Sequence, residues 1–275
     1  MLVFCNGMLR SGSAFQYNLV CTLLEKSGSC KRHARWEPKE KITKSQLIKW
    51  ADDQKTYHVV KSARYPEEFE LAQQGLAKMC YINRDLRDVA VAAKFKWKLN
   101  SDELIVMLDR ALSIQDVMEE RNAFGMSWCL HQKYEDVFNE TANAVKEIAD
   151  FLEISPSHEV IEEVVKDCSI DVMLKSSNST LLIFRHKILR LLGRIANTIK
   201  KFLPPPLNGS WKLRRFYLTL LPKVDSHTVM APRHIEPTKG VPGAWKKELS
   251  QLEKIFITER YQIYLEKEGY SLDLL

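Results

Sequence analysis

The chain has 275 residues, of which 45% are hydrophobic and 28% are charged. This composition excludes an intrinsically disordered, collagen-like or disulfide-scaffold protein and predicts a globular chain of one large or two small domains. The formal net charge of +6 favours an anionic ligand or an anionic surface as a partner. The six cysteines are scattered without a C-x-x-C pair, which predicts free thiols, a cytoplasmic protein and no zinc site.

Short buried strands and amphipathic helices alternate along the chain. A strand over 2–5 leads through a turn rich in Gly and Ser into a helix over 14–25. Residues 27–50 are polar and basic, and they are predicted to form a surface excursion. Further strands are expected at 57–60, 79–82 and 127–131, and further helices at 101–121, 140–152, 160–165 and 246–269.

This alternation predicts an α/β fold: a single three-layer domain over 1–275 with a central, largely parallel sheet. In the last predicted helix, five apolar residues are expected to point inward: Leu249, Leu252, Ile255, Phe256 and Tyr264. No apolar run approaches the roughly 20 residues that a transmembrane helix needs. The apolar start of the chain is also too short for a signal peptide.

The basic residues are concentrated in one segment. Residues 172–224 contain 11 Lys or Arg and no Asp or Glu, and the segment 176–232 is interpreted as a basic amphipathic insertion. Three interpretations stay open for its helix: peripheral membrane contact through 181–203, a lid or wall of a substrate site, and an ordinary helix that covers the domain. Nucleic-acid binding is not favoured, because the basic face lacks interleaved aromatic residues.

The turn after the first strand is the main candidate for an anion-binding site. Gly7 and Gly12 match the spacing of the nucleotide-binding loop G-x-x-x-x-G-K-[ST], but Ser13 and Ala14 replace its lysine and its metal-binding hydroxyl. ATP or GTP hydrolysis is therefore not favoured. A cation is present inside the loop instead, at Arg10. Free N–H groups and the positive end of the dipole bind anions at a helix N-terminus.

The loop Arg10-Ser11-Gly12-Ser13-Ala14-Phe15 resembles the P-loop-like phosphosulfate-binding loop of the sulfotransferase family, approximately [KR]-S-G-[ST]-[ST]-[WF]. Residues 81–91 are similar to the family's segment [IV]-x-R-[DN]-x-[RK]-D-V-x-V-S, whose arginine, here Arg84, binds the 3′-phosphate of the cofactor. The family's downstream serine is replaced by Ala92. Further segments that resemble the family, in family order, begin at Lys61, Tyr134 and Lys239.

The resemblance implies transfer of a sulfuryl group from 3′-phosphoadenylyl sulfate (PAPS) to a hydroxyl or amine of a small-molecule or lipid-like acceptor. Adenosine 3′,5′-bisphosphate (PAP) is the implied product, and no metal is implied. Arg10 and Lys61 are expected to stabilise the charge of in-line transfer, and backbone amides of 11–13 to bind the 5′-phosphate. The implied cofactor-binding residues are Arg10, Ser11, Gly12, Ser13, Ala14, Phe15, Arg84, Tyr134, Lys239 and Gly240.

The sequence does not identify which residue would act as the general base. The family's histidine after the lysine is Ala63 in this chain. His58 is interpreted as a satisfied core histidine, because residues 58 and 61 point to opposite faces of a strand. The preferred candidate is His234, which precedes the Lys239-Gly240 loop and is expected to be catalytic with Arg10 and Lys61. His33, Glu67 and Glu68 are the alternatives.

Three functions compete at this point. An active sulfotransferase is favoured. A PAPS- or PAP-binding protein of the same fold without catalysis is motivated by Ala14, Ala63 and Ala92, which replace polar family residues. A nucleotide kinase with a degenerate loop is the third. The acceptor and the oligomeric state are left open, and the acceptor walls are expected in 27–50 and 176–232.

Overall fold

The computed structural model describes residues 1–34, 42–61, 65–172 and 238–274. The chain divides into two compact units, Met1–Ser169 with Arg233–Leu275 and Ile170–Pro232, and the fold described below is that of the first unit. The predicted insertion 176–232, its helix at 181–203 and His234 lie outside the described residues. Among the described residues, no helix has both the length and the hydropathy of a membrane-spanning segment.

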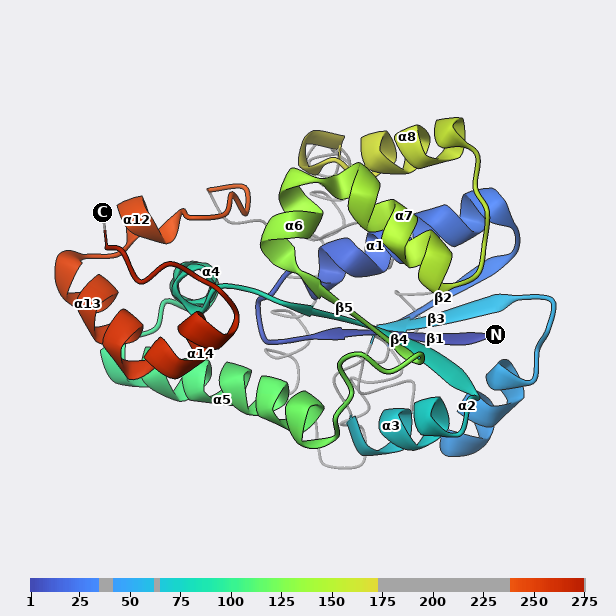
Figure 1. The fold of residues 1–275 in the computed structure, drawn as a ribbon, viewed down its shortest axis with the longest axis horizontal. Helices are drawn as coiled ribbons and strands as arrows, with labels where there is room; N and C mark the ends of the chain where they lie inside the picture. Colours follow the sequence, from blue (N-terminus) through green and yellow to red (C-terminus); the bar gives the residue numbers. More distant parts are fainter. Residues whose placement is uncertain (35–41, 62–64, 173–237, 275) are drawn as a thin grey trace, which may run out of the picture. The chain divides into compact units, whose positions relative to one another are not determined.

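Five parallel strands form one sheet in the order β2-β3-β1-β4-β5 (Figure 1). The strands are β1 (Leu2–Gly7), β2 (Cys30–Ala34), β3 (Tyr57–Lys61), β4 (Ala77–Asn83) and β5 (Cys129–Lys133). The central strand β1 is apolar because both faces of a parallel sheet are covered. It pairs with β3 on one side and β4 on the other. Ligands of such sheets bind outside the carboxyl ends of the strands where the strand order reverses, here at the end of β1.

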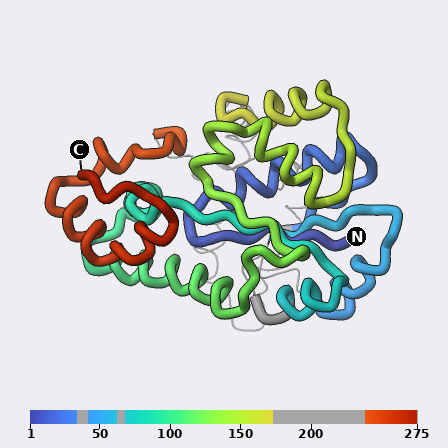
Figure 2. Tube along the Cα trace, viewed as in Figure 1, coloured from blue at the N-terminus to red at the C-terminus, as the bar shows by residue number. Residues whose placement is uncertain are grey.

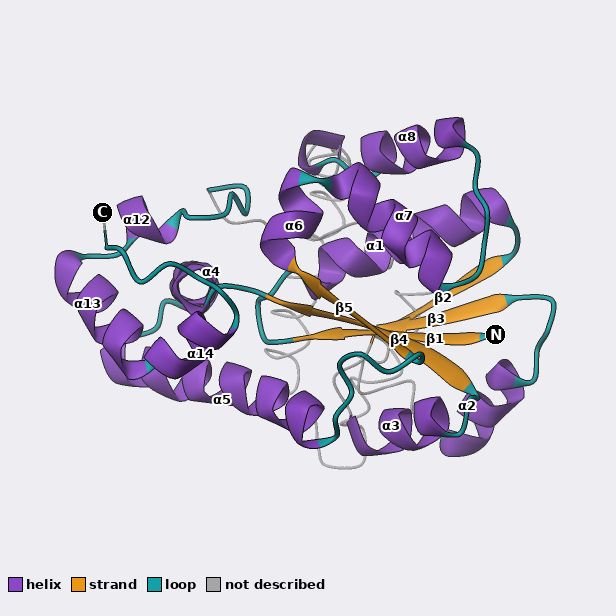
Figure 3. Ribbon diagram, in the orientation of Figure 1, coloured by secondary structure: helices purple, strands orange, loops and turns teal. Residues whose placement is uncertain are grey.

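Helices cover both faces of the sheet, which confirms the predicted α/β fold (Figure 3). One face carries α1 (Ser13–Ser27), α6 (Tyr134–Asn139), α7 (Thr141–Phe151) and α8 (His158–Asp167). The other carries α2 (Lys44–Ala51), α3 (Tyr65–Gln73) and α5 (Ser101–Glu120). Beyond the carboxyl ends lie α4 (Leu86–Trp97), α12 (Trp245–Glu248), α13 (Gln251–Arg260) and α14 (Gln262–Lys267) (Figure 2). A hydrophobic core cluster of the described residues lies on the α2, α3 and α5 side of the sheet, against Leu2, Phe4 and Met79.

The prediction for residues 27–50 was wrong in one respect, because this segment contains β2 and most of α2. β2 is polar because it is an edge strand, held by backbone pairing to β3 alone. Its Arg32 is paired with Glu25 of α1 at 2.6 Å. α2 begins with a capping box between Thr43 and Gln46.

The single helix predicted over 246–269 is also wrong, because the chain breaks it into α12, α13 and α14. Leu249 is extended (φ −92°, ψ 142°), and a capping box at Ser250 starts α13 anew. The restart changes which side chains face inward. Leu252 and Phe256 are 80% and 45% exposed, while Ile257 is buried in their place.

The other predicted elements are confirmed within a few residues. All six cysteines are free thiols, as their spacing predicts.

Candidate active site

The loop between β1 and α1 is fastened to β4. The Met8 amide donates to Ile82 O (3.2 Å) and the Ser11 amide donates to Met8 O (3.2 Å). The buried Ser11 hydroxyl lies 2.9 Å from Met8 O and 2.8 Å from Ile82 O. The Ser11 amide was expected to bind phosphate, but it is already used inside the loop. Ser11 therefore shapes the loop, and the amides that follow it are the remaining candidates for binding a phosphate.

Those amides belong to the first turn of α1. Gly12 is the N-cap residue, and its carbonyl accepts from the Phe15 amide (2.7 Å). Within the described part of the chain, the amides of Gly12, Ser13 and Ala14 donate no backbone hydrogen bond. Arg10 and Gly12 both have left-handed backbones (φ 65° and 89°). Such turns, followed by a helix N-terminus, form an anion-binding concavity.

Tyr134, the first residue of α6, packs against the turn at Gly12. It is buried, and a Cβ atom added to Gly12 would collide with its ring. Gly12 is therefore required twice: for its left-handed backbone and for the close approach of the tyrosine.

Gly12→Ala tests this requirement. The left-handed backbone costs about 1 kcal/mol for alanine, and displacement of the ring adds about 1–2 kcal/mol. Urea denaturation measures the loss. The matched control is Gly125→Ala, since Gly125 has φ 83° but nothing within 4 Å of its added Cβ. Equal destabilisation of the two variants would contradict the close contact with Tyr134.

Arg84 lies at the carboxyl end of β4 and is 3% exposed. Its guanidinium stacks over the Tyr134 ring at 4.3 Å, and its Nη2 donates to Gly240 O (3.3 Å). The structure thus brings together predicted site residues from four segments: Gly12, Arg84, Tyr134 and Gly240. The neighbouring Lys239 is exposed, with a left-handed backbone (φ 53°).

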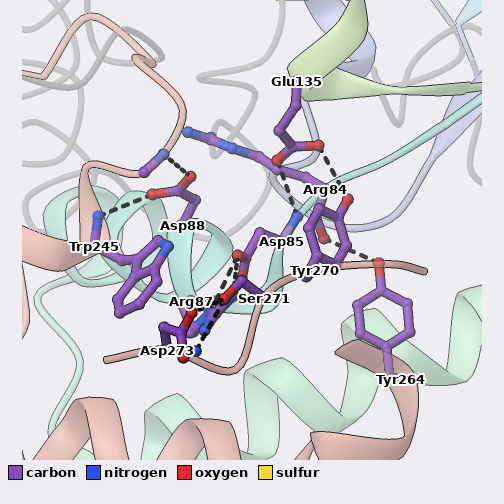
Figure 4. Close-up of polar contacts among 11 residues, drawn as sticks. Arg84, Asp85, Arg87, Asp88, Glu135, Trp245, Tyr264, Tyr270, Ser271 and Asp273 are labelled. Atoms are coloured by element: carbon purple, nitrogen blue, oxygen red, sulfur yellow. Dashed lines mark hydrogen bonds and ion pairs between the residues drawn. The ribbon is translucent and has the colours of Figure 1, made fainter. Parts of the chain in front are cut away.

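The helix that follows Arg84 anchors the loop 238–245 (Figure 4). Asp88 accepts from the amides of Gly243 (2.7 Å) and Trp245 (2.9 Å). Burial raises the pKa of the Asp88 carboxyl, and nearby Arg84 opposes this rise. Arg87 pairs with Asp85 at 2.7 Å and stacks over the Trp245 ring at 4.0 Å. Arg87 and Asp88 therefore anchor the loop 238–245. Arg84 is the cation of this segment that lies beside the loop of α1, through its contact with Tyr134.

The sequence did not reveal a C-terminal clamp, formed by Tyr264, Glu268 and Tyr270, that holds the turn carrying Arg84. The Tyr264 hydroxyl donates to the carbonyl of Arg84 (3.0 Å). The Tyr270 hydroxyl donates to Glu135 (3.0 Å), which in turn accepts from the Asp85 amide (3.1 Å) (Figure 4). No local pattern signals such contacts, because they join residues far apart in the chain.

Glu268, the third member of the clamp, is 7% exposed and fixes the end of β4 itself. Its carboxylate accepts from the side-chain amides of Asn83 (2.7 Å) and Gln115 (3.1 Å). Its carbonyl also accepts from Lys133. The ends of β4 and β5 are thus both bound to Glu268, at the end of α14.

Lys61 ends β3, directly beside Cys5 in the register of β1. Burial lowers the pKa of its ammonium to about 8, and the charges of Lys96 and Arg10 contribute in the same direction. No described residue forms an ion pair with the Lys61 ammonium. Arg10, Lys61 and Lys96 thus form a positive region, and a bound anion would relieve their mutual repulsion.

The histidines and carboxylates considered as bases differ in their surroundings. His58 is a satisfied core histidine, as predicted: it is 3% exposed and its Nε2 lies 3.0 Å from Asp53 Oδ2. Its Nδ1 lies 3.0 Å from His33 Nε2. Glu68 is fully buried and accepts from Asn6 (2.7 Å). His234, Ala63 and the side chain of Glu67 lie outside the described residues.

The remaining predicted residues take supporting positions. Phe15 is buried in α1, and Ser13 and Ala14 are half-buried in its first turn. Ala92, at the family's serine position, is 1% exposed on α4. No group of three or more potential metal ligands is present in the described ranges.

The fold is that of an α/β protein with a parallel sheet, and the loop between β1 and α1 lies at the switch point of this sheet. The family model of the sulfotransferase domain matches residues 3–223, and the chain belongs to this family. No curated protein sequence is significantly similar to it.

Solved structures show the same fold. Mouse sulfotransferase SULT7A1, complexed with PAP, is similar with a TM-score of 0.56 at 13% identity, over 96% of this chain and 84% of that one. Retinol dehydratase, in complex with androsterone and the inactive cofactor PAP, is similar with a TM-score of 0.52 at 14% identity, over 99% and 82%. A second retinol dehydratase structure, with retinol and PAP, gives the same values.

Proposed function

We propose that this chain is an active sulfotransferase that moves a sulfuryl group from PAPS to a hydroxyl or amine of a small-molecule or lipid-like acceptor. The observation that supports the proposal is that the first-turn amides of α1 donate no described backbone hydrogen bond, while Arg84 stacks on the Tyr134 ring that packs against Gly12. A donor with two separate phosphate groups needs separate cations, and Arg10 and Arg84, which come from different segments, would supply them. Family membership and the PAP-bound proteins of the same fold support the choice of donor.

Each group would have a distinct part in this reaction. The amides of Gly12, Ser13 and Ala14 would hold the 5′-phosphate, together with Arg10. Arg84 would hold the 3′-phosphate, because its planar guanidinium offers a bidentate fork. Arg10 and Lys61 would stabilise the charge that develops on the sulfuryl oxygens and on the leaving phosphate.

Other predicted residues would complete the cofactor site. Tyr134 would border it through its contacts with Gly12 and Arg84, and the loop that carries Lys239 and Gly240 would close the side next to Arg84. No step in this scheme requires a metal ion.

The acceptor is a narrower proposal. The relatives of the same fold were crystallised with retinol and androsterone, which favours a small and largely apolar acceptor. We place the enzyme in the cytoplasm, with no nucleic-acid partner. The expected contact of 181–203 with a membrane surface stays a prediction.

A binding protein that has lost catalysis is the second candidate, favoured by the buried methyl group of Ala92 where the family has a serine. A nucleotide kinase is disfavoured, because the loop lacks the lysine and hydroxyl of an ATP site.

A thermal-shift series tests the donor site. PAP at 100 times its Kd should stabilise the protein by about 2.7 kcal/mol, and Mg-ATP should have no comparable effect. Stabilisation by Mg-ATP alone would contradict both the sulfotransferase and the binding-protein proposals. Turnover of labelled PAPS then separates these two.

A further inference from the structure

The peptide group between Arg84 and Asp85 is held on both sides by residues of other segments (Figure 4). Its carbonyl accepts from the Tyr264 hydroxyl (3.0 Å), and its amide donates to Glu135 (3.1 Å). Glu135 in turn accepts from the Tyr270 hydroxyl (3.0 Å). This peptide group lies in the turn between β4 and α4, so its two polar groups take their partners from elsewhere in the fold.

The hydroxyl of Tyr264 matters for the turn because both partners are buried. Arg84 is 3% exposed and Tyr264 is 5% exposed. A buried carbonyl without a donor costs as much free energy as a lost hydrogen bond, so the turn is expected to keep the backbone orientation that reaches Tyr264. The peptide group is attached directly to the Cα atom of Arg84, and the rotamers open to a side chain depend on its backbone. The hydroxyl therefore determines how the guanidinium is presented.

The same hydroxyl also contacts the loop between β1 and α1. It lies 3.3 Å from the sulfur of Met8, which is 1% exposed and whose amide donates to Ile82 O. A carbonyl oxygen is a stronger acceptor than a thioether, so the hydroxyl proton is directed at Arg84 O and the sulfur packs against the oxygen. One side chain thus contacts both segments to which the proposed function assigns a phosphate group.

The ionisation of these groups maintains the arrangement. Burial raises the pKa of the Tyr264 hydroxyl well above its usual value, so the hydroxyl keeps its proton and continues to donate at neutral and alkaline pH. Burial also raises the pKa of the Glu135 carboxyl. The bonds from the Asp85 amide and the Tyr270 hydroxyl, together with the charge of Arg84, oppose that rise. The carboxyl group is thus stabilised as an acceptor by the turn that it holds.

We propose that Tyr264 is a positioning residue of the donor site and that its hydroxyl sets the selectivity of this site for nucleotides with a 3′-phosphate. Glu135 and Tyr270 support it from the other side of the same peptide group. This inference rests on the proposed function, in which Arg84 binds the 3′-phosphate. Tyr264 acts through the backbone of Arg84. The C-terminal segment is then part of the PAPS site, although Tyr264 lies outside residues 3–223, which the family model matches.

The first test is Tyr264→Phe, which keeps the ring and removes the hydroxyl. Isothermal titration calorimetry should show an affinity for PAP that is lower by about 3–10-fold, the usual effect of one neutral hydrogen bond. The affinity for adenosine 5′-monophosphate should stay unchanged, because that ligand has no 3′-phosphate. The ratio of the two affinities is the readout, since a general loosening of the fold would lower both.

The matched control is Tyr261→Phe. Tyr261 is 4% exposed, and its hydroxyl donates to Asp109 of α5 (2.7 Å) rather than to the turn of Arg84. This variant also loses one buried hydroxyl of the C-terminal helices, so its thermal stability should fall while the ratio of affinities stays that of the wild type. A wild-type ratio in Tyr264→Phe would overturn the inference alone. A wild-type protein that fails to bind PAP would overturn the proposed function together with it.

A double-mutant cycle tests whether Tyr264 acts through Arg84. In an Arg84→Ala background, Tyr264→Phe should cause no further loss of PAP affinity, because the side chain that it positions is absent. Losses that add would show that the two residues act independently, which contradicts the inference. If Tyr264→Phe does not fold, Tyr270→Phe gives the same readout, because it releases Glu135 from the other side of the peptide group. Its ratio of affinities should shift in the same direction, and a wild-type ratio would overturn the inference.

Discussion

Lys61→Ala and Arg10→Ala are each expected to lower kcat for sulfuryl transfer by about 10²–10³-fold, the usual effect of removing one preorganised charge-stabilising group. Lys61 ends β3 and Arg10 lies in the left-handed turn that follows β1, and the charge of Arg10 acts on the Lys61 ammonium. The described hydrogen bonds that hold the loop to β4 come from the Met8 amide and the Ser11 hydroxyl. The fold should therefore persist, as circular dichroism and thermal unfolding would verify.

Lys166→Ala is the control for these variants. Lys166 is exposed on α8, so its loss should leave the rate of labelled PAPS turnover unchanged. If Lys61→Ala or Arg10→Ala kept wild-type turnover, the role assigned to that residue would be wrong.

The protonation of Lys61 adds a pH signature to this prediction. Its pKa is lowered to about 8, so the fraction of cationic Lys61 declines as the pH rises through that value. Because kcat/KM reports the free enzyme, its value for PAPS should fall on the alkaline side near pH 8. Lys61→Arg keeps its charge at any accessible pH, and its profile should lack this fall. An identical alkaline limb in both proteins would exclude Lys61 as its source.

Arg84→Ala should weaken PAP binding by about 10–100-fold, since a hydrogen bond to a charged group contributes about 1.5–3 kcal/mol. The same variant should bind adenosine 5′-monophosphate with nearly wild-type affinity, because that ligand lacks the 3′-phosphate. Isothermal titration calorimetry with the two ligands measures the difference directly.

The ratio of the affinities for PAP and for adenosine 5′-monophosphate decides whether Arg84 binds the 3′-phosphate. Arg110→Ala, at an exposed position of α5, should change neither affinity. A loss of affinity that is equal for both ligands would indicate that Arg84 supports the site through Tyr134 and Gly240 rather than by binding the 3′-phosphate.

The residues that could be recognised from the sequence are those whose roles depend on local spacing. The helix α1 follows β1 through a turn with Gly7 and Gly12, and this order alone predicts an anion site at a helix N-terminus. Hydrophobic runs located four of the five strands, because buried parallel strands are apolar throughout. The fifth strand, β2, was not predicted, because an edge strand is held by backbone pairing and tolerates polar side chains.

The remaining features depend on contacts between distant segments. The break at Leu249 follows from a capping box that competes with helix continuation. The function of Asp88 as an anchor for Gly243 and Trp245 requires the C-terminal loop to be in place. Likewise, a pattern search finds His33 and His58 only as isolated histidines, since the register of β2 on β3 brings them together.

The C-terminal clamp also bears on how the protein matures. Tyr264 follows Arg84 by 180 residues, and at 5–20 residues per second a ribosome needs on the order of 10–35 s to synthesise that interval. β1, α1 and β4 emerge first and can pair, but the turn that carries Arg84 acquires its tyrosine and glutamate partners only after that interval. A nascent chain is therefore expected to gain its sheet before it gains affinity for PAP.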